Sequence, residues 1–153
     1  MASSEPTTAD LVAQRTLLFR AGGRTFGCAL DAVREIVPQR RSTRLPGAPP
    51  AVQGLINLRG TIVTVVDLPL WLGGEQPAAR DGSIILVDHG SRVAGLAVDE
   101  VLDVQAIAPE DAVGALADRN GAVRGMGRLG DTVVILLDVT SLVRQALVLG
   151  EKP

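Results

Sequence analysis

Apolar residues in this chain recur in short runs separated by turn-forming residues. The runs Thr16–Ala21 and Arg24–Ala29 flank Gly22-Gly23, and a two-residue glycine connection between such runs is typical of a β-hairpin. About ten short strands with turn signals at regular spacing predict an all-β protein, most simply β-barrels. The other runs interpreted as strands are Ile84–Asp88, Arg92–Val98, Val52–Leu58, Thr61–Asp67, Ala122–Leu129 and Thr132–Asp138.

The pattern occurs twice along the chain. Thr16–Ile36 aligns with Ile84–Val104, 68 residues on, and Leu58–Leu72 aligns with Leu129–Val143, 71 residues on. Glycine and aspartate positions match in both blocks and in the same order, which argues against chance similarity between Val-rich strands. Each copy is therefore expected to form a small antiparallel β unit. The predicted divisions are repeat one at about 16–72, a linker at 73–83, and repeat two at about 84–143.

The remaining segments complete a prediction of one domain over residues 15–149. Asp31–Glu35 and Asp99–Asp103 each begin with an aspartate that can cap a helical turn or sit in a turn. Apolar residues at helical spacing predict a C-terminal helix at about 139–149. Residues 1–14 are expected to be a mobile tail.

Two similar barrels side by side are expected to leave a groove along their pseudo-twofold junction, and clefts of this kind are common binding sites. Residues that differ between the copies would give such a groove its specificity. Arg59 is such a residue, because its counterpart in the second copy is Gly130.

Composition excludes several kinds of chemistry. The chain has 153 residues with one His, one Cys, two Phe, one Trp and no Tyr, so its core must be aliphatic. A zinc site of Cys and His ligands needs about four such groups, and a single Cys forms no internal disulfide. A net charge of −2 and a pI near 5.3 argue against a nucleic-acid surface. Without a basic leader or a long apolar run, the protein is expected to be cytoplasmic.

Individual candidates for catalysis have simpler structural explanations. His89 sits in a predicted hairpin turn without a triad signature, and Cys28 lies within a strand as a small core residue. Asp67 and Asp138 match in the repeat, which favours duplicated caps over acid–base chemistry. The expectation is that the protein has no catalytic, metal or cofactor site and is a binding module. A small hydrolytic or ligand-binding barrel using the same cleft remains as an alternative.

The motifs FRAGGRTFGCALDAVREIV, LP, GLINLRGTIVTVVDL, VAGLAVDEVLDV and GMGRLGDTVVILLDV together resemble the CheW family of bacterial chemotaxis coupling proteins. The resemblance runs from about Thr16 to Val143, and its most specific part is the stretch Gly54–Leu68. It implies two SH3-like five-stranded barrels in one CheW-like domain. The same fold forms the regulatory domain of the kinase CheA, but a free-standing coupler without a kinase or receiver domain is expected here.

The resemblance also implies a function and a site. The family couples chemoreceptors to the histidine kinase CheA, with the receptor's helical hairpin tip lying in the groove between the barrels. Arg59 would face acidic groups or backbone carbonyls of the tip, and Glu35 would face basic ones. The groove positions carried over are Leu30, Glu35, Ile36, Arg59, Val101 and Val104, and further family positions are Val33, Gly54, Gly60 and Gly125.

By the same resemblance the partners would be the receptor tip and the CheA regulatory domain, and the protein would be a monomer when free. It would be recruited to receptor arrays at the inner membrane without inserting into the membrane. The loop Ala108–Gly121 has no aromatic residue to anchor a contact, so no surface for ring assembly is predicted. An alternative within the family is a regulator of a non-flagellar motility or developmental pathway that binds only receptor or only kinase.

Overall fold

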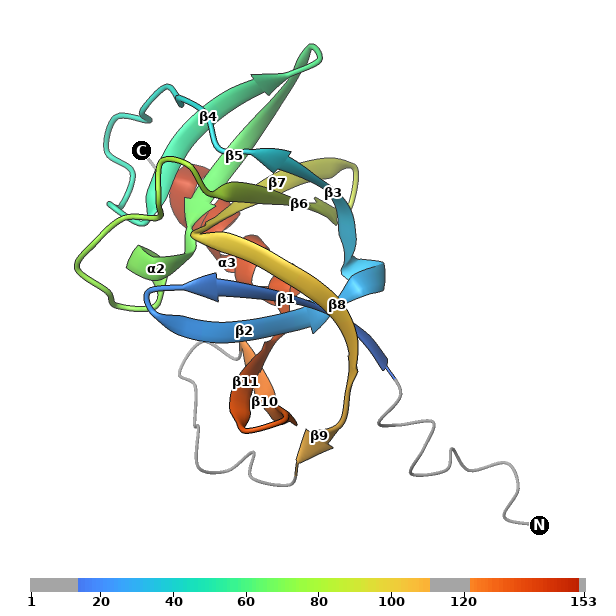
Figure 1. Ribbon diagram of the computed structural model, residues 1–153. Helices are drawn as coiled ribbons and strands as arrows, with labels where there is room; N and C mark the ends of the chain where they lie inside the picture. The colour runs from blue at the N-terminus through green and yellow to red at the C-terminus, as the bar shows by residue number, and fades with distance from the viewer. Residues whose placement is uncertain (1–13, 111–121, 152–153) are drawn as a thin grey trace.

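The chain folds into two curled β-sheets, seen one above the other in Figure 1. The computed structural model describes residues 14–110 and 122–151. In chain order the elements are β1 (Gln14–Ala21), β2 (Arg24–Ala29), the 3-10 turn η2 (Leu30–Ala32), β3 (Val33–Pro38), β4 (Val52–Leu58), β5 (Thr61–Asp67), α2 (Leu68–Trp71), β6 (Ser83–His89), β7 (Arg92–Val98), β8 (Glu100–Ile107), β9 (Pro109–Glu110), β10 (Val123–Leu129), β11 (Thr132–Leu137) and α3 (Val139–Glu151).

The two copies of the repeat exchange their first hairpins. One sheet has the strand order β8-β1-β2-β11-β10-β9 and the other has the order β3-β6-β7-β5-β4. The hairpin β1–β2 of the first copy thus pairs with strands of the second copy, and β6–β7 pairs with strands of the first. The prediction that each copy forms its own β unit is therefore wrong, although two β units are present. We call β1, β2 and β8–β11 the first barrel, and β3–β7 the second barrel.

Both sheets close on themselves. In the first barrel, only Ala108 separates the edge strand β8 from β9, and β9 pairs with β10 at the opposite edge. In the second barrel, the chain beyond β3 reaches the opposite edge strand β4, where Thr43 and Leu55 exchange two backbone hydrogen bonds of 2.7 Å. Closure pairs backbone N–H and C=O groups of the edge strands that could otherwise form hydrogen bonds with another chain.

The pairing registers repeat with the sequence. β11 runs parallel to β2 with Ile135 opposite Phe26, and β5 runs parallel to β7 with Thr64 opposite Ala94. Bulges occur at equivalent places in β4 and β10, where Gly54 (φ +142°) and Gly125 (φ +155°) follow the irregular pair. The pseudo-twofold relation inferred from the sequence therefore extends to individual pairs of residues that face each other on neighbouring strands.

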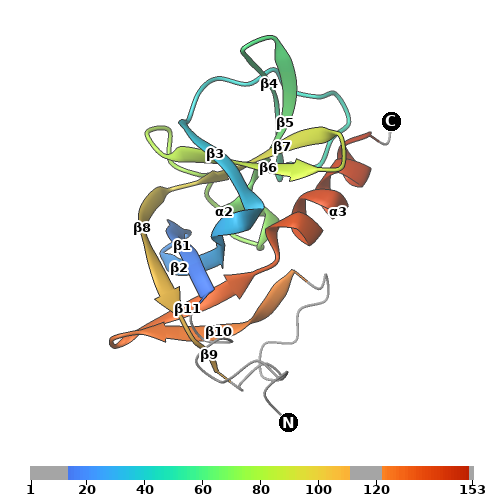
Figure 2. The same cartoon turned by 90° about the vertical axis from the view of Figure 1, so that its right-hand side faces the viewer.

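One large apolar core joins the barrels. It combines buried side chains of β1, β2, β6 and β7 with the apolar face of α3, and it includes Phe19 stacked on Phe26 with ring centroids 6.0 Å apart. Figure 2 shows α3 running beside the strands of the second barrel after leaving β11. A smaller cluster fills each barrel: Val37, Ile56, Leu58, Val63, Val65, Ala78, Ile84, Leu86 and Ala97 in the second, and Leu18, Ile107 and Val134 in the first.

Several boundaries differ from those predicted. Gln14 belongs to β1, where it pairs with Ile107, rather than to a tail, and residues 1–13 of that predicted tail lie outside the described residues. Asp31 lies in the 3-10 turn η2 and Asp99 lies in a bend, as predicted for these aspartates, and the residues that follow them form β3 and β8. The alternation of apolar and polar residues in these two segments is short, and it is pairing of β3 with β6 and of β8 with β1 that makes them strands. Helix α3 ends at Glu151, beyond the predicted end, and most of Ala108–Gly121 lies outside the described residues.

The predicted aspartate caps are present. The Asp67 carboxylate accepts a hydrogen bond of 3.1 Å from the Leu70 N–H, and Asp138 accepts one of 3.0 Å from the Ser141 N–H. Each satisfies a backbone donor in the first turn of the helix that follows. Asp67 is buried, and its pKa is raised mainly by burial, although hydrogen bonds from Ala78 and Leu70 oppose the rise.

Candidate partner-binding surface

Four of the aliphatic residues singled out from the sequence pack against the core that joins the barrels. Leu30 lies in η2, Val33 begins β3, and Val101 and Val104 lie in β8. All four are half-buried and contact that central core. η2 and the start of β8 are the two places where the chain passes between barrels, so these residues lie beside the junction. We call them, with Glu35, Ile36 and Arg59, the junction residues.

Ile36 and the charged pair Glu35–Arg59 are more exposed than the aliphatic four. Ile36 on β3 is 40% exposed, a large fraction for an isoleucine within a strand. The Arg59 guanidinium, at the tip of the β4–β5 hairpin, donates hydrogen bonds to both carboxylate oxygens of Glu35 on β3. The ion pair connects the tip of the β4–β5 hairpin to β3, the first strand of the second barrel.

Arg59 occupies an unusual backbone conformation. Its φ is +52° and that of Gly60 is +87°, the pattern of a two-residue type I′ turn that joins β4 to β5. The Gly60 N–H donates 2.9 Å to the Asn57 side-chain oxygen, which fixes the turn. Among described non-glycine residues Arg59 alone has a positive φ, and the equivalent position of the second copy is Gly130 with φ +60°. A left-handed arginine costs about 1–2 kcal/mol relative to glycine, so its side chain is retained at the expense of stability.

The electrostatics of this pair leave its charges accessible. The hydrogen bond with Arg59 holds the pKa of Glu35 below its ordinary range, and Glu35 raises the pKa of Arg59. Both groups are therefore charged at neutral pH. The Arg59 side chain is 69% exposed and that of Glu35 is 31% exposed. Exposed pairs of this kind are screened by solvent and add little to stability. Breaking the ion pair between Arg59 and Glu35 would therefore cost little free energy.

The glycines among the predicted positions have structural roles. A Cβ on Gly54 would lie 2.3 Å from the Thr43 carbonyl oxygen, so glycine is needed where β4 meets the closing segment. Gly60 has open space around its Cβ position but a positive φ, which a tight turn requires. Gly125 lies at the equivalent bulge of β10.

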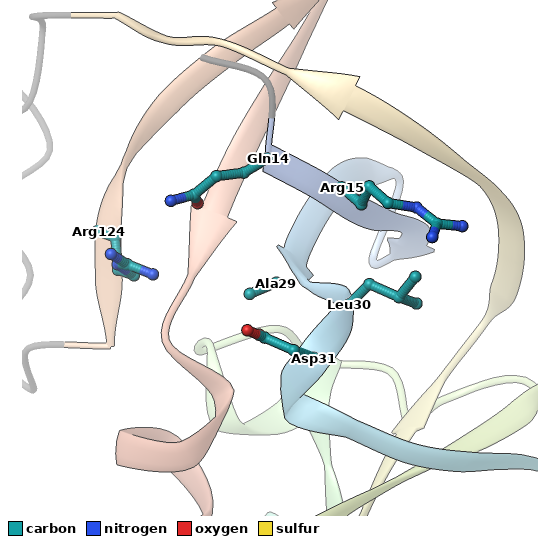
Figure 3. Close-up of a pocket in the computed structure, with 6 residues that line it drawn as sticks. All are labelled: Gln14, Arg15, Ala29, Leu30, Asp31 and Arg124. Atoms are coloured by element: carbon teal, nitrogen blue, oxygen red, sulfur yellow. The ribbon is translucent and has the colours of Figure 1, made fainter. Parts of the chain in front are cut away.

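The cavity that Leu30 helps to line lies at one end of the first barrel rather than along the whole junction. Figure 3 shows Leu30 with Gln14, Arg15, Ala29, Asp31 and Arg124 around this space, whose volume is about 500 Å³. Of these residues, only Leu30 is predicted from the sequence to lie in a binding groove. The polar ones carried no binding motif, and the exchange of hairpins brings Gln14 and Arg15 of β1 and Arg124 of β10 around the same cavity.

The described part of the chain contains no group of three or more His, Cys, Asp or Glu side chains suited to a metal ion. Cys28 is buried as predicted, and burial raises the pKa of its thiol to about 12, so it is no nucleophile at neutral pH. No helix within the described ranges is long and apolar enough to cross a membrane.

These features define a class of protein: a double-barrel β fold whose predicted site consists of aliphatic residues and one exposed ion pair. The model of the CheW-like domain matches residues 15–147, and the chain belongs to this family of non-enzymatic scaffold proteins. The chemotaxis protein CheW of Klebsiella aerogenes is 30% identical over 150 residues, which cover 93% of this chain and 89% of that protein.

Two other comparisons bear on the fold and on the diversity of the family. The crystal structure of the scaffolding protein TtCheW from Thermoanaerobacter tengcongensis superimposes with a TM-score of 0.71 at 28% identity, covering 82% of this chain and 89% of that one. The protein PilI of Pseudomonas aeruginosa is 39% identical over 88 residues, 57% of this chain and 49% of PilI. The fold and the adaptor class inferred from the sequence are thus confirmed.

Proposed function

We propose that this protein couples chemoreceptors to the histidine kinase CheA by holding the receptor's helical hairpin tip against the junction residues. The observation that carries the proposal is the set of half-buried aliphatic side chains of η2, β3 and β8 beside the exposed Arg59–Glu35 pair. Aliphatic side chains that are only partly covered can gain further burial against an amphipathic helix, as in helix-in-groove recognition. Recruitment through receptors would place the protein at the cytoplasmic side of the membrane.

The ion pair supplies polarity at the edge of this apolar surface. Arg59 can donate up to five hydrogen bonds to carboxylates or backbone carbonyls, while Glu35 can accept from basic groups. A partner that offers such groups would replace an internal pair of small net value by intermolecular contacts. The left-handed backbone of Arg59 supports a role for its side chain, because glycine would satisfy the turn with less strain.

The variant Arg59→Gly tests this proposal without disturbing the turn, since Gly130 occupies the same turn position in the second copy. Arg34→Gln is the matched control: Arg34, on β3, is also exposed and also paired, with Asp88 at 2.7 Å. The measurement is co-sedimentation of the purified protein with membranes containing the cognate receptor, with circular dichroism as a check of folding.

We expect Arg59→Gly to lower the co-sedimented fraction at least tenfold, while Arg34→Gln binds as the unaltered protein does. Equal binding by both variants, with unchanged circular dichroism, would show that Arg59 does not contact the receptor. A separate pull-down with the cognate kinase tests the second partner. Capture of receptor without kinase, or of kinase without receptor, would contradict the coupling role.

A second candidate is the same adaptor activity in a pathway other than chemotaxis. The similarity to PilI, a relative that is not named as a chemotaxis protein, favours keeping this candidate. Deletion of the gene followed by separate assays of swimming and of surface motility distinguishes the two. Loss of swimming chemotaxis alone would support the first candidate.

A further inference from the structure

A cavity of about 480 Å³ lies at the second barrel, between two segments that are far apart in the sequence. One wall is formed by residues 39–42, which follow β3 in the segment that closes the barrel. The opposite wall is formed by Pro77, Ala78 and Arg80, in the segment that precedes β6. None of the junction residues lines this cavity, so the proposed contact with a receptor does not explain it.

The lining of this cavity is positively charged. Its charged side chains are the guanidiniums of Arg40, Arg41 and Arg80 and the carboxylate of Asp67, so the lining carries a net charge of +2 in a chain whose net charge is −2. The Asp67 oxygens already accept hydrogen bonds of 3.1 Å from the Leu70 N–H and 2.8 Å from the Ala78 N–H. Backbone donors therefore compensate the single carboxylate, and the three guanidiniums lack a counter-charge within the lining.

The guanidiniums remain available to a ligand. The Arg40 Nε–H donates 3.3 Å to the Pro38 carbonyl, which orients this half-buried side chain and leaves its two terminal nitrogens for other acceptors. Arg41 and Arg80 are exposed, and their side chains form no hydrogen bond or ion pair within residues 14–110 and 122–151. An anion entering the cavity would therefore not have to displace an internal acidic partner from these two arginines.

Hydrogen bonds hold the backbone from which these arginines extend. The Gln39 N–H donates 3.0 Å to the Gly82 carbonyl, which joins the two segments that form the walls. The side-chain amides of Gln39 and Gln53 exchange hydrogen bonds of 3.0 and 3.2 Å, and the Ser42 hydroxyl donates 3.2 Å to the Gln53 carbonyl. Binding would therefore order arginine side chains without rearranging the backbone, and such preorganisation lowers the cost of binding.

We propose that this cavity binds a small soluble organic phosphate through Arg40, Arg41 and Arg80. The arginines reach the cavity from opposite walls, so their ligand must accept hydrogen bonds in several directions. A phosphate monoester presents three acceptor oxygens and about two negative charges at neutral pH, which balance the charge of the lining. A carboxylate presents two oxygens in one plane and is matched by a single guanidinium.

The size of the cavity identifies the rest of the ligand. A volume of about 480 Å³ falls within the range of small-molecule sites, about 300–1,000 Å³, and exceeds what a phosphate group alone would fill. The organic part of the ligand would lie against Pro77 and the guanidinium planes, which stack on flat rings. A confined cavity of this kind suits a small molecule better than a protein surface, since stable protein interfaces bury about 1,200–2,000 Å².

The probe is adenosine monophosphate, with adenosine as the matched molecule that lacks the phosphate. Inorganic phosphate is the second probe, and vesicles of phosphatidylglycerol test a lipid headgroup as the source of the phosphate. Affinities are measured by calorimetric titration of the full chain at physiological ionic strength, and the contact site by amide chemical shifts of the ¹⁵N-labelled protein. The variants are Arg41→Gln and Arg80→Gln. The control is Arg44→Gln, because Arg44 is exposed on the same segment as Arg41 but lies outside the lining.

We expect adenosine monophosphate to bind, with shifts at residues 39–42 and 78–80, and adenosine not to bind. Arg41→Gln and Arg80→Gln should each weaken binding at least tenfold, while Arg44→Gln leaves the affinity unchanged. Inorganic phosphate should bind more weakly than the nucleotide because it leaves most of the cavity empty, and equal affinities would refute the organic part of the ligand.

Three further results would overturn the proposal. These are no binding of the nucleotide at millimolar concentration, equal weakening by Arg44→Gln, and sedimentation with the vesicles without binding of the nucleotide. Both test variants retain Arg59 and Glu35, so receptor binding can fail while nucleotide binding holds, and the reverse.

Discussion

Replacement of Gly54 by alanine is expected to open the second barrel at its closing bridge. The φ of Gly54 is +142°, a conformation that residues with side chains rarely adopt. The added Cβ would lie 2.3 Å from the carbonyl oxygen of Thr43 and 2.9 Å from its carbonyl carbon. Both are backbone atoms, so the segment around Thr43 would have to move away from β4.

The energetic cost can be built from these contacts. Backbone strain at such a position costs about 1–3 kcal/mol. Moving Thr43 also breaks its two hydrogen bonds to Leu55, each of 2.7 Å, and a typical hydrogen bond contributes about 1 kcal/mol net. Gly54→Ala should therefore lower the free energy of unfolding by about 3–5 kcal/mol.

The control is Gly60→Ala, at a glycine that also has a positive φ but open space around the Cβ position. Only strain applies there, at about 1–2 kcal/mol. The stability losses of the two variants are measured by urea unfolding, monitored by circular dichroism and by the fluorescence of Trp71. With a slope of about 1–3 kcal/mol per molar urea, the midpoint for Gly54→Ala should fall further than that for Gly60→Ala. Equal losses in the two variants would refute the account of a steric bridge.

Three further outcomes are expected. Asp99→Ala removes the acceptor for the Gly22 and Ala79 N–H groups, both at 2.8 Å. Calorimetry should therefore show a free energy of unfolding lower by about 2–3 kcal/mol. A change within experimental error would show that water replaces the carboxylate. Cys28, whose thiol pKa is raised to about 12 by burial, should react with dithionitrobenzoate at pH 8 only after urea unfolding, and rapid native reaction would contradict its burial. Because Arg59 lowers the pKa of Glu35 in the folded state, the stabilisation from Glu35 is present at neutral pH and is lost as the pH falls through the ordinary and then the lowered value. Glu35→Gln should therefore show a smaller fall of Tm on acidification.

The strands themselves could be predicted because their periodicity is local. The hairpins around Gly22-Gly23 and Gly90-Ser91 and the capping aspartates Asp67 and Asp138 follow from residues a few positions apart. Positive φ angles at Gly60 and Gly130 follow in the same way from turn chemistry. Each of these features is decided by short stretches of chain, so the sequence specifies it directly.

The exchange of hairpins could not be predicted, because duplication makes the two candidate partners alike. β3 pairs with β6, but β1 presents nearly the same pattern of apolar residues as β6. Local patterns cannot distinguish a partner in the same copy from its equivalent in the other. The Arg59–Glu35 pair is hidden for a related reason: the residues are 24 positions apart and meet only once the barrel has closed. The one available signal was the contrast of Arg59 with Gly130.

The exchange of hairpins also determines what holds the two halves of the chain together. Every barrel needs strands from both repeats, so a chain of one repeat could complete a barrel only by associating with a second copy in twofold symmetry. The linker acts as a tether that turns this association into an intramolecular reaction at high effective concentration. Cleavage at Gly73-Gly74 should therefore leave two fragments that stay associated rather than two independent barrels. The covalent link fixes one copy of each half, and this allows a residue such as Arg59 to occur in only one of the two copies.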